Sequence, residues 1–177
     1  MTSLLFFDTD CLSAFLWTNN ESLLPKLYPG RMVIPRPVYV ELSNPRVIHL
    51  KSKIDIMINS KEVTVQDIFS GTNEFDTYYQ LTERPTPGNV LIGKGEAASI
   101  ALAKAKGGVV ASNNLRDISR YVKEFSLEVI TTGDILVEAY ERKIISEVDG
   151  DKIWEDMLAK RRRLGANSFT EFLSLHK

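Results

Sequence analysis

Five short apolar runs, separated by segments with helical periodicity, constrain the fold of this chain most strongly. We expect the runs to be strands, and they read LLFF, MVIP, VTVQ, VVAS and EVITT at residues 4–7, 32–35, 63–66, 109–112 and 128–132. Strands that alternate with helices favour a mainly parallel sheet covered by helices on both faces. The sequence therefore predicts an α/β fold with a central sheet of about five strands.

The segments between these runs have the apolar spacing of amphipathic helices. We expect helices at residues 11–18, 37–43, 74–83, 94–106, 118–125 and 134–143, and two more at about 151–164 and 169–175. The interval 44–61 is ambiguous, and helix is the favoured interpretation. No repeat, low-complexity tract or long linker divides the chain. We therefore expect one domain over residues 1–177, with C-terminal helices at about 151–175.

Composition excludes several classes of protein and of site. The chain of 177 residues is 44% hydrophobic and 25% charged, the balance of an ordinary globular protein. No apolar run approaches the roughly 20 residues of a membrane helix, and no signal peptide is recognisable, so we expect a cytoplasmic protein without a membrane partner. The one cysteine, Cys11, excludes an intramolecular disulfide and a cysteine zinc cluster. Since His49 and His176 lie in unremarkable surroundings, carboxylates must hold any bound metal.

The first apolar run stops at two carboxylates, Asp8 and Asp10, before a second apolar segment begins. Asp10 can cap the helix that follows, because a side-chain oxygen at a helix start accepts from unpaired backbone N–H groups. Asp8 is left without such a role. Ligands of parallel sheets bind beyond the carboxyl ends of the strands, and Asp8 ends the first strand. We therefore predict that Asp8 belongs to a functional site.

Three further carboxylates follow strands in a similar way. Glu41 shares a helical stripe with Val38 and Leu42, where an ionised group is costly unless it is paired or bound to a cation. Glu96 lies in the first turn of an alanine-rich helix, and Asp117 precedes the helix after the fourth strand. Each has an ordinary explanation: Glu41 can reach water if its helix rolls, Glu96 suits the helix dipole, and Asp117 can be an N-cap.

The four carboxylates together indicate a metal site. Asp8, Glu41, Glu96 and Asp117 all lie at strand ends or in the first turns of the next helices, along one edge of a parallel sheet. Converging carboxylates repel one another, and Mg²⁺ or Mn²⁺, which take oxygen ligands, relieve that repulsion. Because 22 lysines and arginines face 23 aspartates and glutamates, the chain without these four acids has a charge of +3. This charge is compatible with a phosphate-rich substrate.

Two groups of cations are candidate RNA contacts. The first is the run Lys160, Arg161, Arg162 and Arg163 in the last turn of a predicted helix, and the second is the sparser set Arg116, Arg120 and Lys123. Such a run is also typical of a solvated helix end, where cations suit the C-terminal dipole. We use both groups only as supporting evidence for a nucleic-acid partner.

Two glycine-rich patterns suggest a phosphate-binding loop instead. GNVLIGKG reproduces G-x-x-x-x-G-K but has Gly95 where a P-loop needs a serine or threonine hydroxyl, which argues against it. GKGEAA fits G-x-G-x-x-A loosely, with Asp117 near the distance of a ribose-binding acid, although the match occurs in the middle of the chain. A nucleotide-binding module therefore remains an alternative.

The chain resembles the PIN-domain nucleases, a family that includes the toxins of the prokaryotic VapBC type. FFDTDCLSAFL, IPRPVYVEL, GEAASIALA and ASNNLRDI are similar to the family's first strand and acid, its helix-borne glutamate, its acid on an alanine-rich helix and its strand–loop ending in an aspartate. EVITTGDILVEAYERKIIS resembles its last strand and helix. The resemblance implies a catalytic quartet and two supporting polar residues. These are Asp8, Glu41, Glu96 and Asp117, of which Asp8, Glu96 and Asp117 would bind metal, with Ser112 and Asn114 as support.

The resemblance also implies metal-assisted hydrolysis of phosphodiester bonds. One or two Mg²⁺ or Mn²⁺ ions, about 3.5–4 Å apart if paired, would activate a water and stabilise the leaving oxygen. The expected substrate is RNA, cut to leave a 5′-phosphate, and the expected protein partners are a cognate antitoxin and a second copy of the chain. Many relatives have an aspartate near the position of Asn114, where this chain departs from the pattern. A catalytically silent PIN-like protein that only binds or regulates is a further alternative.

Overall fold

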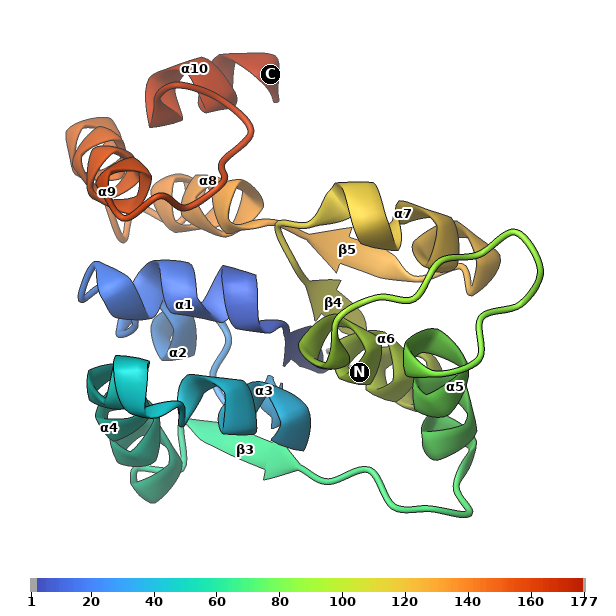
Figure 1. Ribbon diagram of the computed structural model, residues 1–177. Helices are drawn as coiled ribbons and strands as arrows, with labels where there is room; N and C mark the ends of the chain where they lie inside the picture. Colours follow the sequence, from blue (N-terminus) through green and yellow to red (C-terminus); the bar gives the residue numbers. More distant parts are fainter. Residues whose placement is uncertain (1–2, 177) are drawn as a thin grey trace.

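The computed structural model describes residues 3–176 and is built around a five-stranded sheet whose neighbouring strands are all parallel (Figure 1). The strands are β1 (Leu5–Phe7), β2 (Met32–Pro35), β3 (Val63–Gln66), β4 (Val109–Ala111) and β5 (Glu128–Ile130). Their order across the sheet is β3-β2-β1-β4-β5. All five predicted strands are confirmed, although β1, β4 and β5 are one or two residues shorter than predicted.

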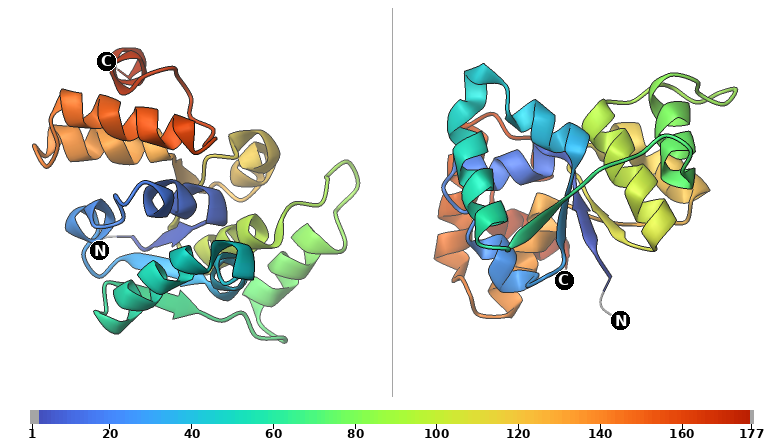
Figure 2. Two further views of the ribbon diagram at one scale, coloured as in Figure 1. Left: turned by 60° about the vertical axis from the view of Figure 1, so that its left-hand side comes forward. Right: turned by 90° about the horizontal axis from the view of Figure 1, so that it is seen from below.

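The central strands are buried on both faces, because the side chains of a strand alternate between the two sides of its sheet. Leu5 and Phe7 belong to the apolar cluster of one face, whereas Phe6 belongs to the cluster of the other. β2 and β4 divide in the same way. Figure 2 shows helices on both sides of the sheet. The prediction of a parallel sheet flanked on both faces is confirmed, and double-sided burial explains the continuous apolar runs.

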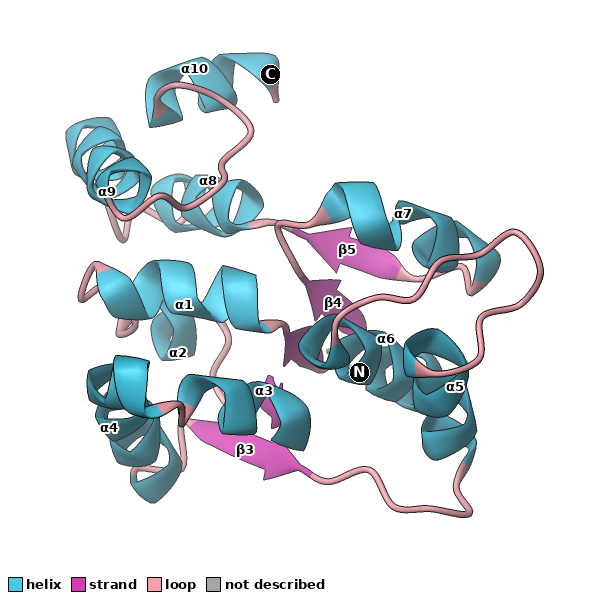
Figure 3. Cartoon of the chain, in the orientation of Figure 1, coloured by secondary structure: helices cyan, strands magenta, loops and turns pink. Residues whose placement is uncertain are grey.

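Ten α-helices surround the sheet within residues 3–176, and Figure 3 distinguishes them from strands and loops. The helices that pack into the first cluster are α1 (Thr9–Trp17), α2 (Leu23–Leu27), α3 (Arg36–Leu42), α4 (Ile48–Asn59), α8 (Thr132–Glu141), α9 (Glu147–Ala159) and α10 (Phe169–Leu175). Those of the second are α5 (Asn73–Thr82), α6 (Lys94–Lys106) and α7 (Leu115–Glu124). Among all of them, none combines the length and the hydrophobicity that crossing a membrane requires.

Four helices begin two to four residues before their predicted starts: α1, α7, α8 and α9. For three of them the reason is the N-cap, because the side chains of Asp8, Thr131 and Ser146 accept the capping hydrogen bonds. The ambiguous interval 44–61 contains a short 3₁₀ helix (Pro45–Val47) and α4. The helix α2 was not predicted, because its five residues are too few to show a helical period.

The connections that leave β1 and β4 run to opposite sides of the sheet. β1 leads through α1 and α2 to β2 on one side, and β4 leads through α7 to β5 on the other. In open α/β sheets, ligands bind outside the carboxyl ends of two neighbouring strands that diverge in this way. Asp8 directly follows β1 and Ser112 directly follows β4. The fold therefore places both residues at this switch point.

Candidate functional site

Asp8 is a fully buried carboxylate at the carboxyl end of β1. Its Oδ1 accepts a hydrogen bond of 2.7 Å from the backbone N–H of Cys11, which makes Asp8 the N-cap of α1. Its Oδ2 is buried and has no hydrogen-bond partner among residues 3–176. Loss of hydration raises the pKa of Asp8 to about 7, although the Ser112 hydroxyl and the Cys11 N–H oppose the shift. Because Oδ2 has no hydrogen-bond partner within residues 3–176, this oxygen can bind a proton or a cation.

Glu41, on α3, is exposed and is held by two neutral donors. Its Oε1 accepts from the backbone N–H of Gly95 at 3.1 Å, and its Oε2 accepts from the hydroxyl of Thr9. The beginnings of α1 and α6 therefore meet at one carboxylate of α3. The expectation that Glu41 lies on a core-facing stripe is wrong, because Val38 and Leu42 are buried while the short helix leaves Glu41 at the surface.

Glu96 is half-buried in the first turn of α6 and contacts the loop after β4. Its Oε2 accepts from the backbone N–H of Gly93 at 3.2 Å, and its Oε1 accepts from the side-chain amide of Asn114 at 2.5 Å. The same amide nitrogen donates to Oδ2 of Asp117 at 2.8 Å. The backbone N–H of Asn114 donates to Oγ of Ser112 at 3.2 Å. Asn114 thus links the carboxylates of α6 and α7.

The carboxylates border a cavity of about 160 Å³. Its lining combines acidic residues with the start of two helices and comprises Asp8, Thr9, Asp10, Glu41, Gly93, Gly95 and Glu96. The structure therefore brings Asp8, Glu41 and Glu96 to one cavity, whereas Asp117 is connected to it through Asn114. In the described part of the chain, no lysine or arginine forms an ion pair with any of these four carboxylates.

Asp10 lines this cavity from the first turn of α1 and is not the helix cap that the sequence analysis predicts. Its Oδ1 lies 3.5 Å from Nη1 of Arg162. The same guanidinium nitrogen donates to Oγ of Ser13 at 3.2 Å. Both contacts hold the loop after α9 against α1, beside the acidic cavity.

The cationic run lies in that loop, and not in a helical turn as predicted, because α9 ends at Ala159. Nζ of Lys160 lies 5.8 Å from the ring centroid of Trp17. Arg161 and Arg163 are exposed. Within this run, Arg162 therefore contacts Asp10, Lys160 lies beside Trp17, and Arg161 and Arg163 face solvent.

The second cationic group lies on α7 together with the exposed Asp117. Because α7 begins at Leu115, Asp117 is in its first turn, and the ordinary explanation of Asp117 as an N-cap is wrong. Arg116 and Arg120 are exposed. The guanidinium of Arg120 donates to the backbone carbonyl of Gly88, so this cation already braces the loop before α6.

Gly95 and Thr9 also line the acidic cavity, and neither was predicted to belong to the site. A Cβ atom at Gly95 would lie 2.7 Å from Oγ1 of Thr9 and 3.0 Å from Oε2 of Glu41. Only glycine therefore lets α6 approach the other two helices this closely. A signal for the close approach is present in the sequence as the glycines of GKGEAA.

The chemistry of the cavity fits a hard divalent cation with few protein ligands. All its charged groups are carboxylates, and Oδ2 of Asp8 is unpartnered. Residues 3–176 contain no group of three or more acidic, histidine or cysteine side chains close enough to form a ready-made metal cage. Mg²⁺ is commonly bound through one or two carboxylates, with waters and substrate phosphates as its other ligands.

Comparison with known proteins agrees with the resemblance. The DUF3368 family model, described as a PIN domain, matches residues 4–177. The match therefore covers the whole sheet and all the residues of the acidic cavity. No curated protein matches the chain.

Proposed function

The chain belongs to the PIN domain family, and from this premise we propose that it is a Mg²⁺- or Mn²⁺-dependent ribonuclease. The observation that carries the proposal is the buried Asp8 at the switch point of the sheet. A helix cap needs only one carboxylate oxygen, and Cys11 already occupies Oδ1. The second oxygen is buried at a cavity that three more carboxylates line, which is costly unless a cation binds there.

We assign distinct roles to the acidic residues. A bound divalent ion would supply an activated water and would stabilise the charge that develops on the leaving oxygen. Asp8 would hold that ion through Oδ2, and Glu96 would hold it from the first turn of α6. Thr9 and Gly95 hold the carboxylate of Glu41 in place, so Glu41 can position a water molecule or accept its proton.

The remaining residues of the predicted site act indirectly in this proposal. Asp117 is a third candidate ligand, but it is exposed and reaches the cavity through Asn114. Asn114 keeps Glu96 and Asp117 together without a metal, and Ser112 supports Asp8. Mutual repulsion between the carboxylates is thereby lowered until an ion binds.

RNA as the substrate is supported by the cations beside the cavity. Arg162 contacts Asp10, while the neighbouring Arg161 and Arg163 face solvent, where they can contact phosphates. A role as the toxin of a toxin–antitoxin pair, a cognate antitoxin, a homodimer and a cytoplasmic location are further parts of the proposal that rest on the family resemblance. A small antitoxin-like reading frame beside the gene would support the toxin role.

The alternative of a nucleotide-binding module based on GKGEAA has an electrostatic difficulty. The backbone N–H groups of Gly93 and Gly95, which would have to cradle a phosphate, already donate to Glu96 and Glu41. A phosphate placed there would be repelled by both carboxylates. The other alternative, a catalytically silent PIN-like protein, predicts that the chain binds RNA without cleaving it.

The test is cleavage of mixed single-stranded and structured RNA by the wild-type protein, by Asp8→Asn and by Asp149→Asn. Asp149 lies in the first turn of α9 and serves as a matched acidic control outside the cavity. We expect wild-type and control proteins to cleave with Mn²⁺ or Mg²⁺, to stop with EDTA and to recover when metal is restored. Asp8→Asn should lose at least about a hundredfold in rate, because an amide holds the ion poorly. Cleavage that persists after thorough chelation would contradict the proposal, and absence of cleavage with bound metal would favour the silent alternative.

A further inference from the structure

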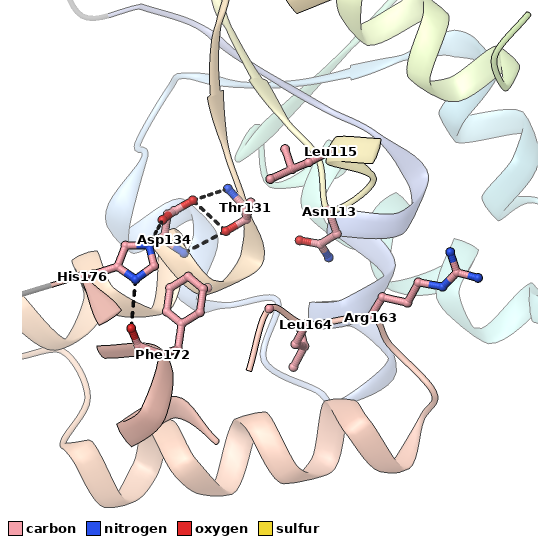
Figure 4. Close-up of a pocket in the computed structure, with 10 residues that line it drawn as sticks. Asn113, Leu115, Thr131, Asp134, Arg163, Leu164, Phe172 and His176 are labelled. Atoms are coloured by element: carbon pink, nitrogen blue, oxygen red, sulfur yellow. Dashed lines mark hydrogen bonds and ion pairs between the residues drawn. The ribbon is translucent and has the colours of Figure 1, made fainter. Parts of the chain in front are cut away.

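A second cavity, of about 340 Å³, opens at the carboxyl ends of β4 and β5 (Figure 4). It is formed by the loop after β4, the first turn of α8, the loop between α9 and α10, and α10 itself. Its main lining side chains are Asn113, Leu115, Arg163, Leu164, Phe172 and His176. The volume is within the range of about 300–1,000 Å³ that is typical of small-molecule sites.

The walls of this cavity are mainly apolar, with polar groups at defined places. Leu115, Leu164 and Phe172 supply aliphatic and aromatic surface, and Leu115 is 46% exposed although it is a large apolar residue. Asn113 supplies an amide, and Arg163 also borders the cavity, although its guanidinium extends away from the other lining side chains. A nucleobase has the matching character, because its faces are apolar and its edge forms hydrogen bonds.

The cavity is held in shape by contacts between the elements that form it. The side chain of Asn113 donates to Oγ1 of Thr132 and accepts from its backbone N–H, both at 2.8 Å. α10 packs directly on α8, since a Cβ atom at Gly133 would lie 2.4 Å from the ring of Phe172. The ring of His176 stacks on Phe172 with centroids 4.0 Å apart. The apolar wall therefore exists before any ligand binds, which lowers the entropic cost of binding.

Arg163 at this cavity is free, in contrast to its neighbour Arg162. Within the described residues, the guanidinium of Arg163 forms no ion pair or side-chain hydrogen bond, whereas Arg162 binds Asp10 and Ser13. Figure 4 shows the Arg163 side chain extending away from Leu164. A free guanidinium that extends outward beside an apolar pocket can bind the phosphate next to a bound base.

The second cavity and the acidic site share one loop. Asn113 lines the second cavity, and the next residue, Asn114, holds Glu96 and Asp117. We propose that the second cavity binds one unpaired nucleobase of the RNA strand whose backbone passes the acidic site, with Arg163 on the adjacent phosphate. This inference rests on the proposed ribonuclease function and adds to it a preference for single-stranded RNA.

The test compares two fluorescent probes of equal length and charge: a twelve-nucleotide uridine strand and an abasic ribose–phosphate chain. Binding to the full-length protein is measured by anisotropy with Ca²⁺ present, and probe integrity is checked on a gel. Base contacts contribute roughly tenfold per base, so the wild-type protein should bind the uridine strand about tenfold more tightly. Leu115→Ala should reduce this ratio at least about threefold, whereas Arg163→Gln removes a phosphate contact and should weaken the binding of both probes.

Two matched variants control for size and charge. Ile56 is an exposed aliphatic residue on α4, and Arg161 is an exposed arginine of the same loop as Arg163, and neither lines the cavity. Ile56→Ala should therefore leave both affinities unchanged. Arg161→Gln should weaken both probes equally, because it removes a phosphate contact outside the cavity.

The possible outcomes separate this inference from the proposed function. Equal affinity of the wild-type protein for the two probes, together with RNA cleavage, would overturn the base site and leave the ribonuclease proposal intact. Tighter binding of free uridine monophosphate than of the strand would also overturn it, since the cavity would then serve a free nucleotide. A protein that neither binds nor cleaves RNA would overturn both proposals.

Discussion

The backbone N–H of Gly95 donates to Oε1 of Glu41 at 3.1 Å, although 54 positions separate the two residues in the sequence. The contact orients a carboxylate of α3 from the first turn of α6, and it depends on the absence of a side chain at Gly95. A single added carbon atom at Gly95 would therefore disturb the geometry of the acidic cavity.

Gly95→Ala should lower both stability and activity. Alanine improves helix propensity by about 1 kcal/mol, but overpacking costs about 1–3 kcal/mol. We expect the overpacking to prevail, because the new Cβ would lie 2.7 Å from Oγ1 of Thr9. Thermal unfolding should show a lower midpoint, and Mn²⁺-dependent RNA cleavage should fall at least about tenfold. Adding Thr9→Ala removes the clashing hydroxyl and should restore part of the stability without restoring activity; full activity of Gly95→Ala alone would contradict the proposed role of Glu41.

Asp8→Asn should remove a pH dependence from the stability of the metal-free protein. Because burial raises the pKa of Asp8 from 3.8 to about 7, the folded protein holds this proton more tightly than the unfolded chain does. Asp8 therefore makes the wild-type protein progressively less stable as pH rises from about 4 to about 7, by up to about 1.4 kcal/mol per pH unit.

The measurement is denaturant unfolding of wild type and Asp8→Asn in EDTA at several pH values between 4 and 8. The free-energy difference should grow in favour of the variant as pH rises and should level off above about pH 7. Added Mg²⁺ should stabilise the wild-type protein and not the variant. A constant difference across the whole pH range would show that Asp8 titrates normally in the folded protein.

Asn114→Asp should make the site bind metal more tightly and the metal-free protein less stable. The change replaces the shared donor of Glu96 and Asp117 with a third negative charge. We expect a loss on the order of 1 kcal/mol without metal and roughly tenfold higher affinity for Mn²⁺ by calorimetry. Asn114→Ala is the control: it loses the donor without gaining charge, so it should be destabilised without the gain in affinity.

Arg161 and Arg163, two exposed cations of the loop after α9, should contribute to RNA binding, whereas Arg162 between them should contribute to stability. Replacing Arg161 and Arg163 by glutamine should lower the slope of log affinity against log salt by about 1.4, since each phosphate contact to a single strand accounts for about 0.7. Metal affinity should not change. Replacing Arg162 instead breaks its contacts with Asp10 and Ser13 and should cost up to about 1 kcal/mol of stability. An unaltered salt slope for the double variant would assign these cations to an ordinary solvated surface.

The fold was predictable where one local signal decides the structure. The three central strands are short apolar runs because both of their faces are buried, and the end of the first run at Asp8 indicates the switch point. Helix starts were less predictable, since two neighbouring acids such as Asp8 and Asp10 can both serve as the cap and only the backbone geometry selects one.

The contacts within the site could not be predicted, because they join residues that are far apart in the chain. Nothing near Glu41 indicates that its partners are Thr9 and Gly95. The position of the cationic run depends on where α9 ends, and that helix ends at Ala159 and not at about residue 164 as predicted. The sequence thus suggests which residues carry the chemistry, while their mutual arrangement depends on tertiary packing.

The strand order β3-β2-β1-β4-β5 has a consequence for the chain during its synthesis. The growing polypeptide contains Asp8 and Glu41 early, but Glu96, Asn114 and the strand that pairs with β1 on its other side emerge from the ribosome much later. A nascent chain therefore carries an incomplete acidic cavity until β4 has been synthesised. Under the proposed function, a nascent chain therefore cannot cut the RNA of the ribosome that makes it before β4 has paired with β1.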